Sequence, residues 1–245
     1  MAEENRSACS DARDGSDRVP LYGMLEILLA NATAYANPFA DVELEGTFTS
    51  PTGDDVVFCG FYDGDGKGGQ NGPVWKQRFM PGQVGTWSYV LSFSDGSPGK
   101  KGTFECVAQE ARPGPWKQDP DNPHWFRTMR GDRFLPVAMY ANCPYTPIDW
   151  QDAIRWCVAK GYNTLVTSTM NTWAWADEWG NVTAFATADA GTKTVDYDRL
   201  NLKMWHEWDD MIETAGEKGI YIGPFNGPHG FYGGRRWKYP PIELA

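Results

Sequence analysis

Short runs that alternate apolar and polar residues fill the first part of the chain after a polar start. Turn residues separate them, among them Asn37-Pro38, Pro81-Gly82 and Asp95-Gly96. The strand-like runs are residues 25–29, 42–45, 47–49, 56–59, 75–79, 86–93 and 102–107. Several short strands with turn chemistry between them are typical of a sandwich or barrel. We therefore expect an all-β domain over residues 21–112, with Trp75 and Trp87 in its core.

The spacing of apolar residues changes after the connector 112–115, Arg-Pro-Gly-Pro. A hairpin over residues 125–134 leads into a buried strand over 134–140. A helix then follows, with Thr146 as N-cap, Pro147 at its first position and Gly161 closing it. Residues 162–169 form the next strand. The apolar stripe of this helix is Trp150, Ala153, Ile154, Cys157 and Val158.

A long loop over residues 170–196 leads to a second helix around 200–215, which ends at Gly219 before a third strand over 220–225. The expected buried stripe of this helix is Trp205, Trp208, Met211, Ile212 and Ala215, and we also assign Trp150 and Trp156 to helix packing. Three strands joined by two helices form a βαβαβ pattern with parallel strands. The pattern fits either a doubly wound sheet or the opening of a (β/α)₈ barrel in residues 113–245.

Charge and length restrict the function classes. The 245 residues carry 22 Lys+Arg against 32 Asp+Glu, a net charge of −10, which argues against nucleic acid or an anionic membrane as partner. The polar residues 1–20 lack the pattern of a signal peptide, so we expect a disordered tail and a cytoplasmic protein. Five cysteines without a CxxC pair indicate a reducing compartment and no zinc site.

Three local patterns are set aside. Residues 64–69 match G-x-G-x-x-G, but Asn71-Gly72-Pro73 prevents the helix that would hold a pyrophosphate. Asp63-x-Asp65 lacks the later ligands of a calcium loop, so a glycine-rich hairpin turn is expected instead. His206 has no second histidine at zinc-site spacing and is interpreted as a surface residue. The sequence thus predicts no metal and no cofactor.

Ordered motifs in the first domain resemble a known module. Asn37-Pro-Phe39, residues 47–53, residues 60–64, residues 78–81 and residues 85–89 are similar to the immunoglobulin-like sandwich of unassigned function that precedes glycoside hydrolase barrels in bacteria. The resemblance implies an accessory domain.

The second segment resembles apiosidase-like glycoside hydrolases through residues 123–126, 131–134, 159–163, 195–196 and 209–220. This resemblance favours the barrel and implies a retaining enzyme that acts on plant or bacterial polysaccharide or oligosaccharide. The family often has Gly-Asp-Thr at the end of the first barrel strand, where this chain has residues 138–141, Ala-Met-Tyr-Ala. The fold expected overall is therefore an all-β immunoglobulin-like sandwich followed by an incomplete TIM-type barrel.

Retaining hydrolysis needs two carboxylates about 5 Å apart. In this superfamily they follow the fourth and seventh strands, and the pattern here reaches only the third. We therefore expect a chain truncated after the third strand, with the catalytic carboxylates beyond residue 245 and this fragment inactive alone. Asp177 and Glu178 are the local candidates, but adjacent side chains diverge and cannot act as a pair.

Sugar-binding residues are expected in the loops after the strands, where barrels place their sites. Aromatic rings and amides suit the apolar faces and hydroxyls of a sugar. The predicted contacts are Tyr140, Asn142, Asn171, Trp173, Trp175, Asn226 and His229. The alternative is a non-catalytic glycan-binding or interaction protein. The sequence does not indicate the sugar, the linkage or the oligomeric state.

Overall fold

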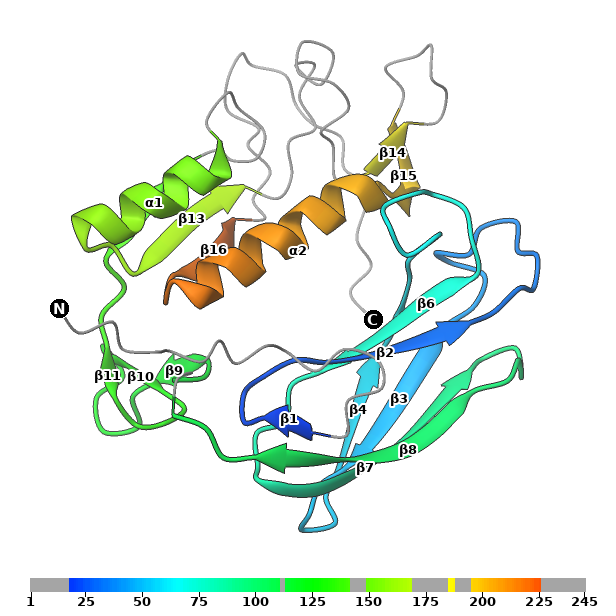
Figure 1. Ribbon diagram of the computed structural model, residues 1–245, viewed down its shortest axis with the longest axis horizontal. Helices are drawn as coiled ribbons and strands as arrows, with labels where there is room; N and C mark the ends of the chain where they lie inside the picture. Colours follow the sequence, from blue (N-terminus) through cyan, green and yellow to red (C-terminus); the bar gives the residue numbers. More distant parts are fainter. Residues whose placement is uncertain (1–17, 111–112, 142–148, 169–184, 188–194, 226–245) are drawn as a thin grey trace, which may run out of the picture.

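The computed structural model describes residues 18–110, 113–141, 149–168, 185–187 and 195–225. This part of the chain is mostly β, with several sheets and two helices (Figure 1). The candidate residues Asn142, Asn171, Trp173, Trp175, Asp177, Glu178, Asn226 and His229 lie outside these ranges, as do the proposed N-cap Thr146 and its neighbour Pro147.

Two sheets form the N-terminal unit. The larger has five strands in the order β1-β8-β7-β3-β4, and the smaller has three in the order β2-β6-β5. Neighbouring strands are antiparallel apart from the parallel pair β1 and β8. The larger sheet consists of β1 (Arg18–Pro20), β3 (Leu44–Thr49), β4 (Asp55–Cys59), β7 (Gly85–Phe93) and β8 (Lys100–Val107). The smaller sheet consists of β2 (Leu25–Ala30), β5 (Phe61–Tyr62) and β6 (Val74–Phe79).

The sequence located most of these strands, with three differences. Residues 44–45 of the first run and the run 47–49 form one strand, β3, because Gly46 continues the alternation instead of breaking it, and residues 42–43 lie before the strand. The two-residue β5 is too short to give a pattern. Residues 18–20, which the sequence assigned to the tail, pair with β8 as β1.

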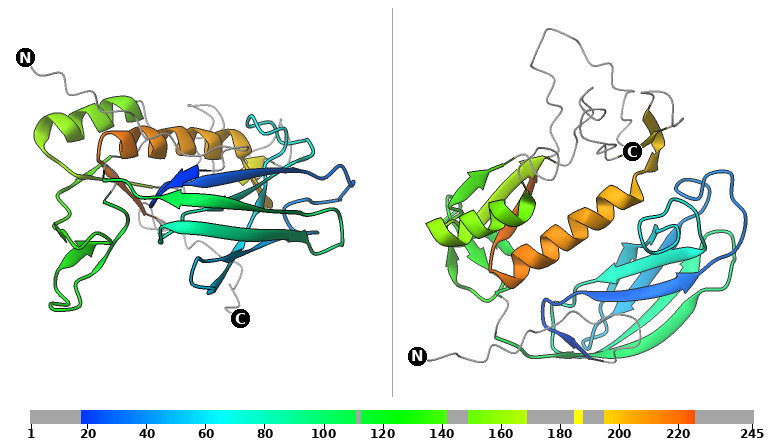
Figure 2. Two further views of the ribbon diagram at one scale, coloured as in Figure 1. Left: turned by 60° about the horizontal axis from the view of Figure 1, so that its bottom comes forward. Right: turned by 45° about the horizontal axis from the view of Figure 1, so that its top comes forward.

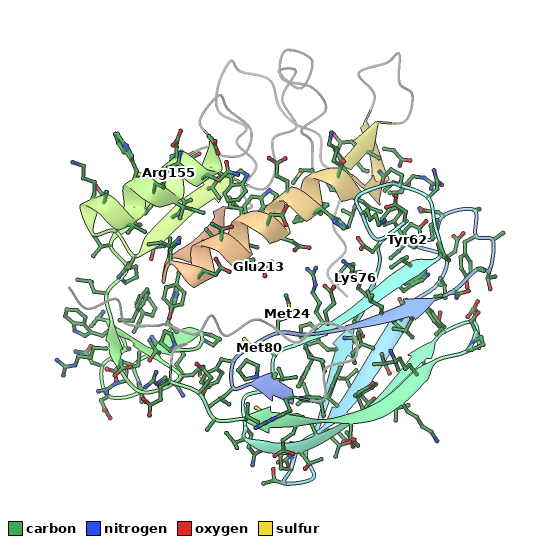
Figure 3. The ribbon with its side chains drawn as sticks, in the orientation of Figure 1. Met24, Tyr62, Lys76, Met80, Arg155 and Glu213 are labelled. Atoms are coloured by element: carbon green, nitrogen blue, oxygen red, sulfur yellow. The ribbon has the colours of Figure 1, made fainter. Side chains whose placement is uncertain are left out.

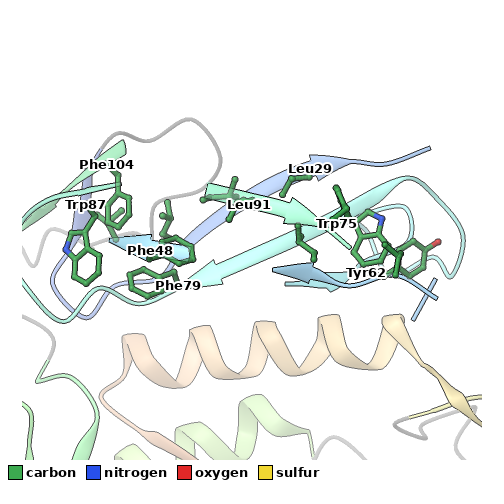
Figure 4. Packing of buried hydrophobic residues seen from close by; sticks show 14 of the residues in the cluster. Leu29, Phe48, Tyr62, Trp75, Phe79, Trp87, Leu91 and Phe104 are labelled. Carbon is green, nitrogen blue, oxygen red and sulfur yellow. The ribbon is translucent and has the colours of Figure 1, made fainter. Parts of the chain in front are cut away.

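Aromatic rings fill the space between the two sheets (Figure 4). Phe48 from the larger sheet stacks on Phe79 from the smaller one, with ring centroids 4.0 Å apart. Trp75 packs edge-on against Phe93, and Trp87 lies parallel to Phe104. The prediction that Trp75 and Trp87 are core residues is confirmed, since both are buried.

The second unit contains a parallel sheet of β12 (Ala138–Tyr140), β13 (Thr164–Ser168) and β16 (Tyr221–Phe225). Helix α1 (Trp150–Lys160) connects the first two strands, and helix α2 (Leu202–Glu217) precedes the third. The predicted βαβαβ order is therefore confirmed, but the expectation of a buried strand over 134–140 is wrong, since β12 covers only its last three residues and these are exposed or half-buried. Both helices share one apolar cluster with Leu165 and Ile220, so they cover the same face of the sheet. The described strands form no closed barrel.

Helix α1 begins later than the sequence suggested. Asp149, in an extended conformation, is its N-cap and accepts a hydrogen bond from the Gln151 amide, whereas Thr146 was expected to do so. Gly161 ends the helix in the left-handed conformation, as predicted. Val158 is exposed, and the assignment of Trp156 to the core is wrong. Trp156 is 64% exposed because it lies off the stripe of Trp150, Ala153, Ile154 and Cys157.

Helix α2 is packed on two sides (Figure 2). Met204, Trp208, Met211 and Ala215 face the parallel sheet and α1. Leu202 belongs to the core cluster of the N-terminal unit. Of the predicted stripe, Trp208, Met211 and Ala215 are confirmed as buried. Trp205 is only partly buried, and Ile212 is exposed towards the N-terminal unit.

Two small sheets complete the described fold. The first comprises β9 (Trp116–Gln118), β10 (Phe126–Thr128) and β11 (Arg133–Phe134), so the expected hairpin gains a third strand. Its Phe134 packs against Tyr221 of β16 with ring centroids 4.7 Å apart. The second comprises β14 (Phe185–Thr187), within the segment predicted as a loop, and β15 (Val195–Leu200), which begins at the end of that segment. Neither described helix is long and apolar enough to cross a bilayer.

Replacement of Leu202 tests the packing of α2 against the N-terminal unit. Leu202 is 2% exposed, whereas Ile212 on the same helix is 49% exposed. We expect Leu202→Ala to lower the free energy of unfolding by about 2–5 kcal/mol, because it leaves a cavity in the core. Ile212→Ala, the control, should cost less than about 1 kcal/mol. Urea unfolding followed by tryptophan fluorescence measures both, and equal losses would contradict the two-sided packing.

Candidate functional site

The carboxyl ends of the three parallel strands lie at one edge of their sheet. Tyr140 ends β12 and is paired with Val166 of β13, which in turn is paired with Gly223 of β16. The neighbouring Met139 packs on the helix-covered cluster, so Tyr140 belongs to the opposite face. Tyr140 is 54% exposed. Tyr140 is the predicted sugar contact that the described residues include.

The other predicted contacts follow these same strand ends in the sequence but lie outside the described residues. They are Asn142 after β12, Asn171, Trp173 and Trp175 after β13, and Asn226 and His229 after β16. Asp177 and Glu178 also lie outside them. The roles assigned to all of these residues stay predictions.

A group of charged side chains, which the sequence did not reveal, lies where the smaller sheet meets α2 (Figure 3). Alternation along β6 turns Trp75, Gln77 and Phe79 towards the core and Lys76 and Arg78 outward. Glu26 on β2 lies directly across from Arg78. Helix α2 supplies His206 and Asp209 from the side that faces the N-terminal unit. These side chains, together with Asp63, are called the interface network below.

Arg78 is the central cation of the interface network. Its Nη1 and Nη2 donate to the two carboxylate oxygens of Asp209 at 2.8 and 2.6 Å, and its Nε donates to Glu26 at 2.8 Å. The guanidinium carbon is 5.1 Å from the centre of the Phe61 ring. Burial alone would lower the pKa of Arg78, but the hydrogen bonds and charges of Asp209 and then Glu26 outweigh it and raise the pKa. A bidentate ion pair of this kind fixes the orientation of the two side chains as well as their distance.

Lys76 and His206 share the buried carboxylate of Asp63. Lys76 Nζ is 2.9 Å from Asp63 Oδ2, and His206 Nε2 is 2.7 Å from Asp63 Oδ1. Lys76 Nζ also lies 3.5 Å from Glu26. The interpretation of His206 as a surface residue is therefore wrong. It was missed because a polar residue on a helix suggests solvent unless a second packed face is known.

A cavity of about 500 Å³ lies beside the interface network. Tyr22, Met24, Met80 and Ile212 provide its apolar wall, and the polar wall consists of Glu26, Lys76, Arg78, His206, Asp209, Asp210 and Glu213. Its sheet residues Glu26, Lys76 and Arg78 already form ion pairs. Among the described residues, no three His, Cys, Asp or Glu side chains gather as metal ligands would.

The glycine-rich segment after β5 is a turn, as predicted, and it also contacts α2. Asp65 accepts hydrogen bonds from the Lys67 and Gly69 amides at 2.8 Å, which lower the pKa of its carboxyl group. Gly64 and Gly68 have positive φ, and a side chain at Gly64 would collide with Leu202. Gln70 Nε2 donates to Leu200 O at 2.8 Å, beside the start of the helix. The glycines thus allow the turn to approach the helix closely.

Comparison with known proteins gives a family match for the first part of the chain and a fold likeness for most of it. Residues 18–94 match the profile of a family described as a domain of unknown function, DUF5060. This match agrees with the expected N-terminal domain of unassigned function. No curated protein sequence matches the chain.

A solved structure with a similar fold is "a putative glycoside hydrolase from Bacteroides vulgatus ATCC 8482", with a TM-score of 0.72 and 24% identity. The alignment covers 86% of this chain and 41% of that one, so this chain spans less than half of its neighbour. A chitinase from Paenibacillus sp. str. FPU-7, described as a multi-modular enzyme, aligns at 13% identity over 89% of this chain and 17% of its own. Its TM-score of 0.23 is too low to indicate a common fold.

Removal of the Arg78 charge tests the interface network. Arg78→Met leaves the carboxylates of Glu26 and Asp209 without their shared cation, and we expect a loss of about 1–2 kcal/mol in unfolding free energy. The value is modest because the Asp209 side chain is 38% exposed. The control is Arg155→Met on α1, where Arg155 pairs with Asp152 and both side chains are largely exposed. We expect the control to change stability by less than about 0.5 kcal/mol in the same urea titration. A similar loss in both variants would argue against a specific role for Arg78.

Proposed function

We propose that the chain is the N-terminal part of a carbohydrate-active enzyme of the retaining glycoside hydrolase type. In this proposal β12, β13 and β16 are the first three strands of a (β/α)₈ barrel. Strands β1 to β8 form the immunoglobulin-like accessory domain that precedes it. The substrate is a plant or bacterial polysaccharide or oligosaccharide.

The arrangement of α1 and α2 carries this proposal. A doubly wound sheet has helices on both faces, whereas in a barrel every helix lies on the outer face. Here both helices cover one face, and the strands follow one another in sequence order, β12-β13-β16. The Bacteroides protein of similar fold is described as "a putative glycoside hydrolase", which supports the proposed activity class. The step from fold to sugar chemistry is an analogy, because one fold hosts many activities.

The face of the parallel sheet opposite the two helices would then be the barrel interior. Tyr140 and Val166 lie in one row across this face, and Tyr140 is at the sheet edge where barrels bind substrate. A phenol ring at such an edge can stack on the apolar face of a sugar and hydrogen bond through its hydroxyl. We place the two carboxylates of the retaining mechanism on strands other than these three. The present chain supplies sugar contacts.

Glycan binding by the full 245-residue chain tests the proposal. Affinity electrophoresis against a panel of plant and bacterial polysaccharides would identify a ligand, and titration would then compare two variants. We expect Tyr140→Ala to weaken binding by about tenfold, or about 1.4 kcal/mol, because the stacking ring is lost. Trp156→Ala is the control, since Trp156 is 64% exposed and lies off the buried stripe of α1. Its affinity should equal that of the unmodified chain.

The binding results of the two variants test whether the strand ends form a substrate cleft. Loss of binding in Tyr140→Ala alone supports a substrate cleft at the strand ends. Failure to bind any polysaccharide, or equal loss in both variants, would overturn the proposal. Release of reducing ends by the unmodified chain would place the carboxylates within it, and loss of that activity in Asp177→Asn or Glu178→Gln would assign them.

A further inference from the structure

Strand β4 has an open edge. It pairs with β3 on one side and ends the order β1-β8-β7-β3-β4 among the described strands. All five of its residues, Asp55 to Cys59, are exposed, although Val56, Val57 and Phe58 are apolar. Exposed apolar edges are templates for pairing with another strand. The exposed edge of β4 is therefore a candidate for pairing with a further strand.

The two edges of the larger sheet differ in how well they are protected against pairing with another strand. The opposite edge, β1, has only three residues and ends in Pro20, which cannot donate to a further strand. Strand β4 contains no proline and no lysine, and its register with β3 is unbroken. Short length, proline, charge and bulges are the usual means of blocking an edge. Of the two, only β4 is thus suited to accept a strand.

The hydrogen bonds of β3 and β4 show which backbone groups are available at this edge. Ser50 N donates to Asp54 O, and Gly60 N donates to Leu44 O. Bonded pairs recur at every second residue of an antiparallel ladder, so Val56 and Phe58 also bond to β3. The amides and carbonyls of the alternate residues, Asp55, Val57 and Cys59, therefore point away from β3. This set is symmetric about Val57.

We propose that two copies of this chain associate through antiparallel pairing of their β4 strands about a two-fold axis at Val57. In this register Val57 pairs with Val57 of the second copy, and Asp55 pairs with Cys59. All of the outward amides and carbonyls of the three residues find partners, and the two sheets become one continuous sheet. The proposal is independent of the function proposed above.

Side chains are compatible with the same register. Val56 of one copy lies opposite Phe58 of the other in the closer, non-hydrogen-bonded type of pair, so each shields the other from water. The one charged residue of the strand, Asp55, faces Cys59 and not its own copy, which avoids like-charge contact. A ladder of five residues is small for a protein interface, and each chain has a net charge of −10. The dimer is therefore a weak one that depends on concentration.

Sedimentation velocity on the full chain, over about 5 to 500 µM, measures this association. We expect the average mass to rise from 27.4 kDa towards twice that value. Val57→Lys should weaken association by at least about tenfold, because it places two lysines against each other at the axis. The matched control is Val90→Lys. Val90 is 57% exposed and Val57 is 56% exposed, and both flank Thr47 on the outer face of the sheet, but Val90 is not at the edge.

A second variant separates edge pairing from contact through the sheet face. Val57→Pro removes an amide that points away from β3, so the bonds within the monomer are retained. We expect it to be folded by circular dichroism and monomeric. A monomeric unmodified chain at every concentration, equal weakening in Val57→Lys and Val90→Lys, or a dimer that persists in Val57→Pro would each overturn the proposal.

Disulfide cross-linking tests the proposed register between the two β4 strands. Asp55→Cys would place a thiol opposite Cys59 of the second copy, at about the 5.5 Å Cα separation that a disulfide allows. Oxidation should yield a covalent dimer whose linked peptides contain residues 55 and 59, which mass spectrometry identifies. A dimer whose linked peptides exclude this pair would overturn the register.

Discussion

Helix α2 is the element on which the rest of the structure depends, because it is buried on two sides at once. Its residues Met204, Trp208 and Met211 complete the core beneath the parallel sheet. Leu202 on the other side enters the core of the N-terminal unit. One rigid helix that belongs to two cores leaves little freedom between them. The glycine-rich turn after β5 contacts this same helix, and Arg78 of β6 forms an ion pair with it.

The two sides of α2 are stabilised by different chemistry. The side towards the parallel sheet is apolar, and its burial is the dominant favourable term in folding. The side towards β6 is mostly charged, and the bidentate pair of Arg78 with Asp209 contributes direction more than net free energy. A charged contact of this kind discriminates strongly between orientations, since any other would leave partly buried charges unpaired. The apolar side stabilises the fold, while the charged side selects how the two units are arranged.

This difference explains how much of the structure the sequence could predict. Periodicity located the strands around Trp75 and Trp87 and both helices, since apolar spacing reports one buried face. It could not report the second face of α2, whose His206 and Asp209 look like solvated residues. The N-cap was misplaced because Thr146 and Asp149 both suit that position, and only the backbone conformation decides. For the candidate site, parallel strand order predicts which edge Tyr140 occupies. Loop residues follow no periodic pattern, so the positions of their side chains cannot be predicted from the sequence alone.

The open edge of β4 and the paired face of β6 show how one chain can use sheets for two kinds of contact. The contact with α2 is intramolecular, so it forms at any concentration and can rely on costly, oriented charges. The contact proposed for β4 is intermolecular and must overcome the loss of translational freedom, which favours backbone bonds and apolar pairs such as Val56 with Phe58. If the strand ends near Tyr140 bind a polysaccharide, two copies joined at β4 present two such sites to one polymer. The second site then binds at a local concentration set by the dimer geometry, so a weak dimer and weak single sites together give firm attachment to a long chain.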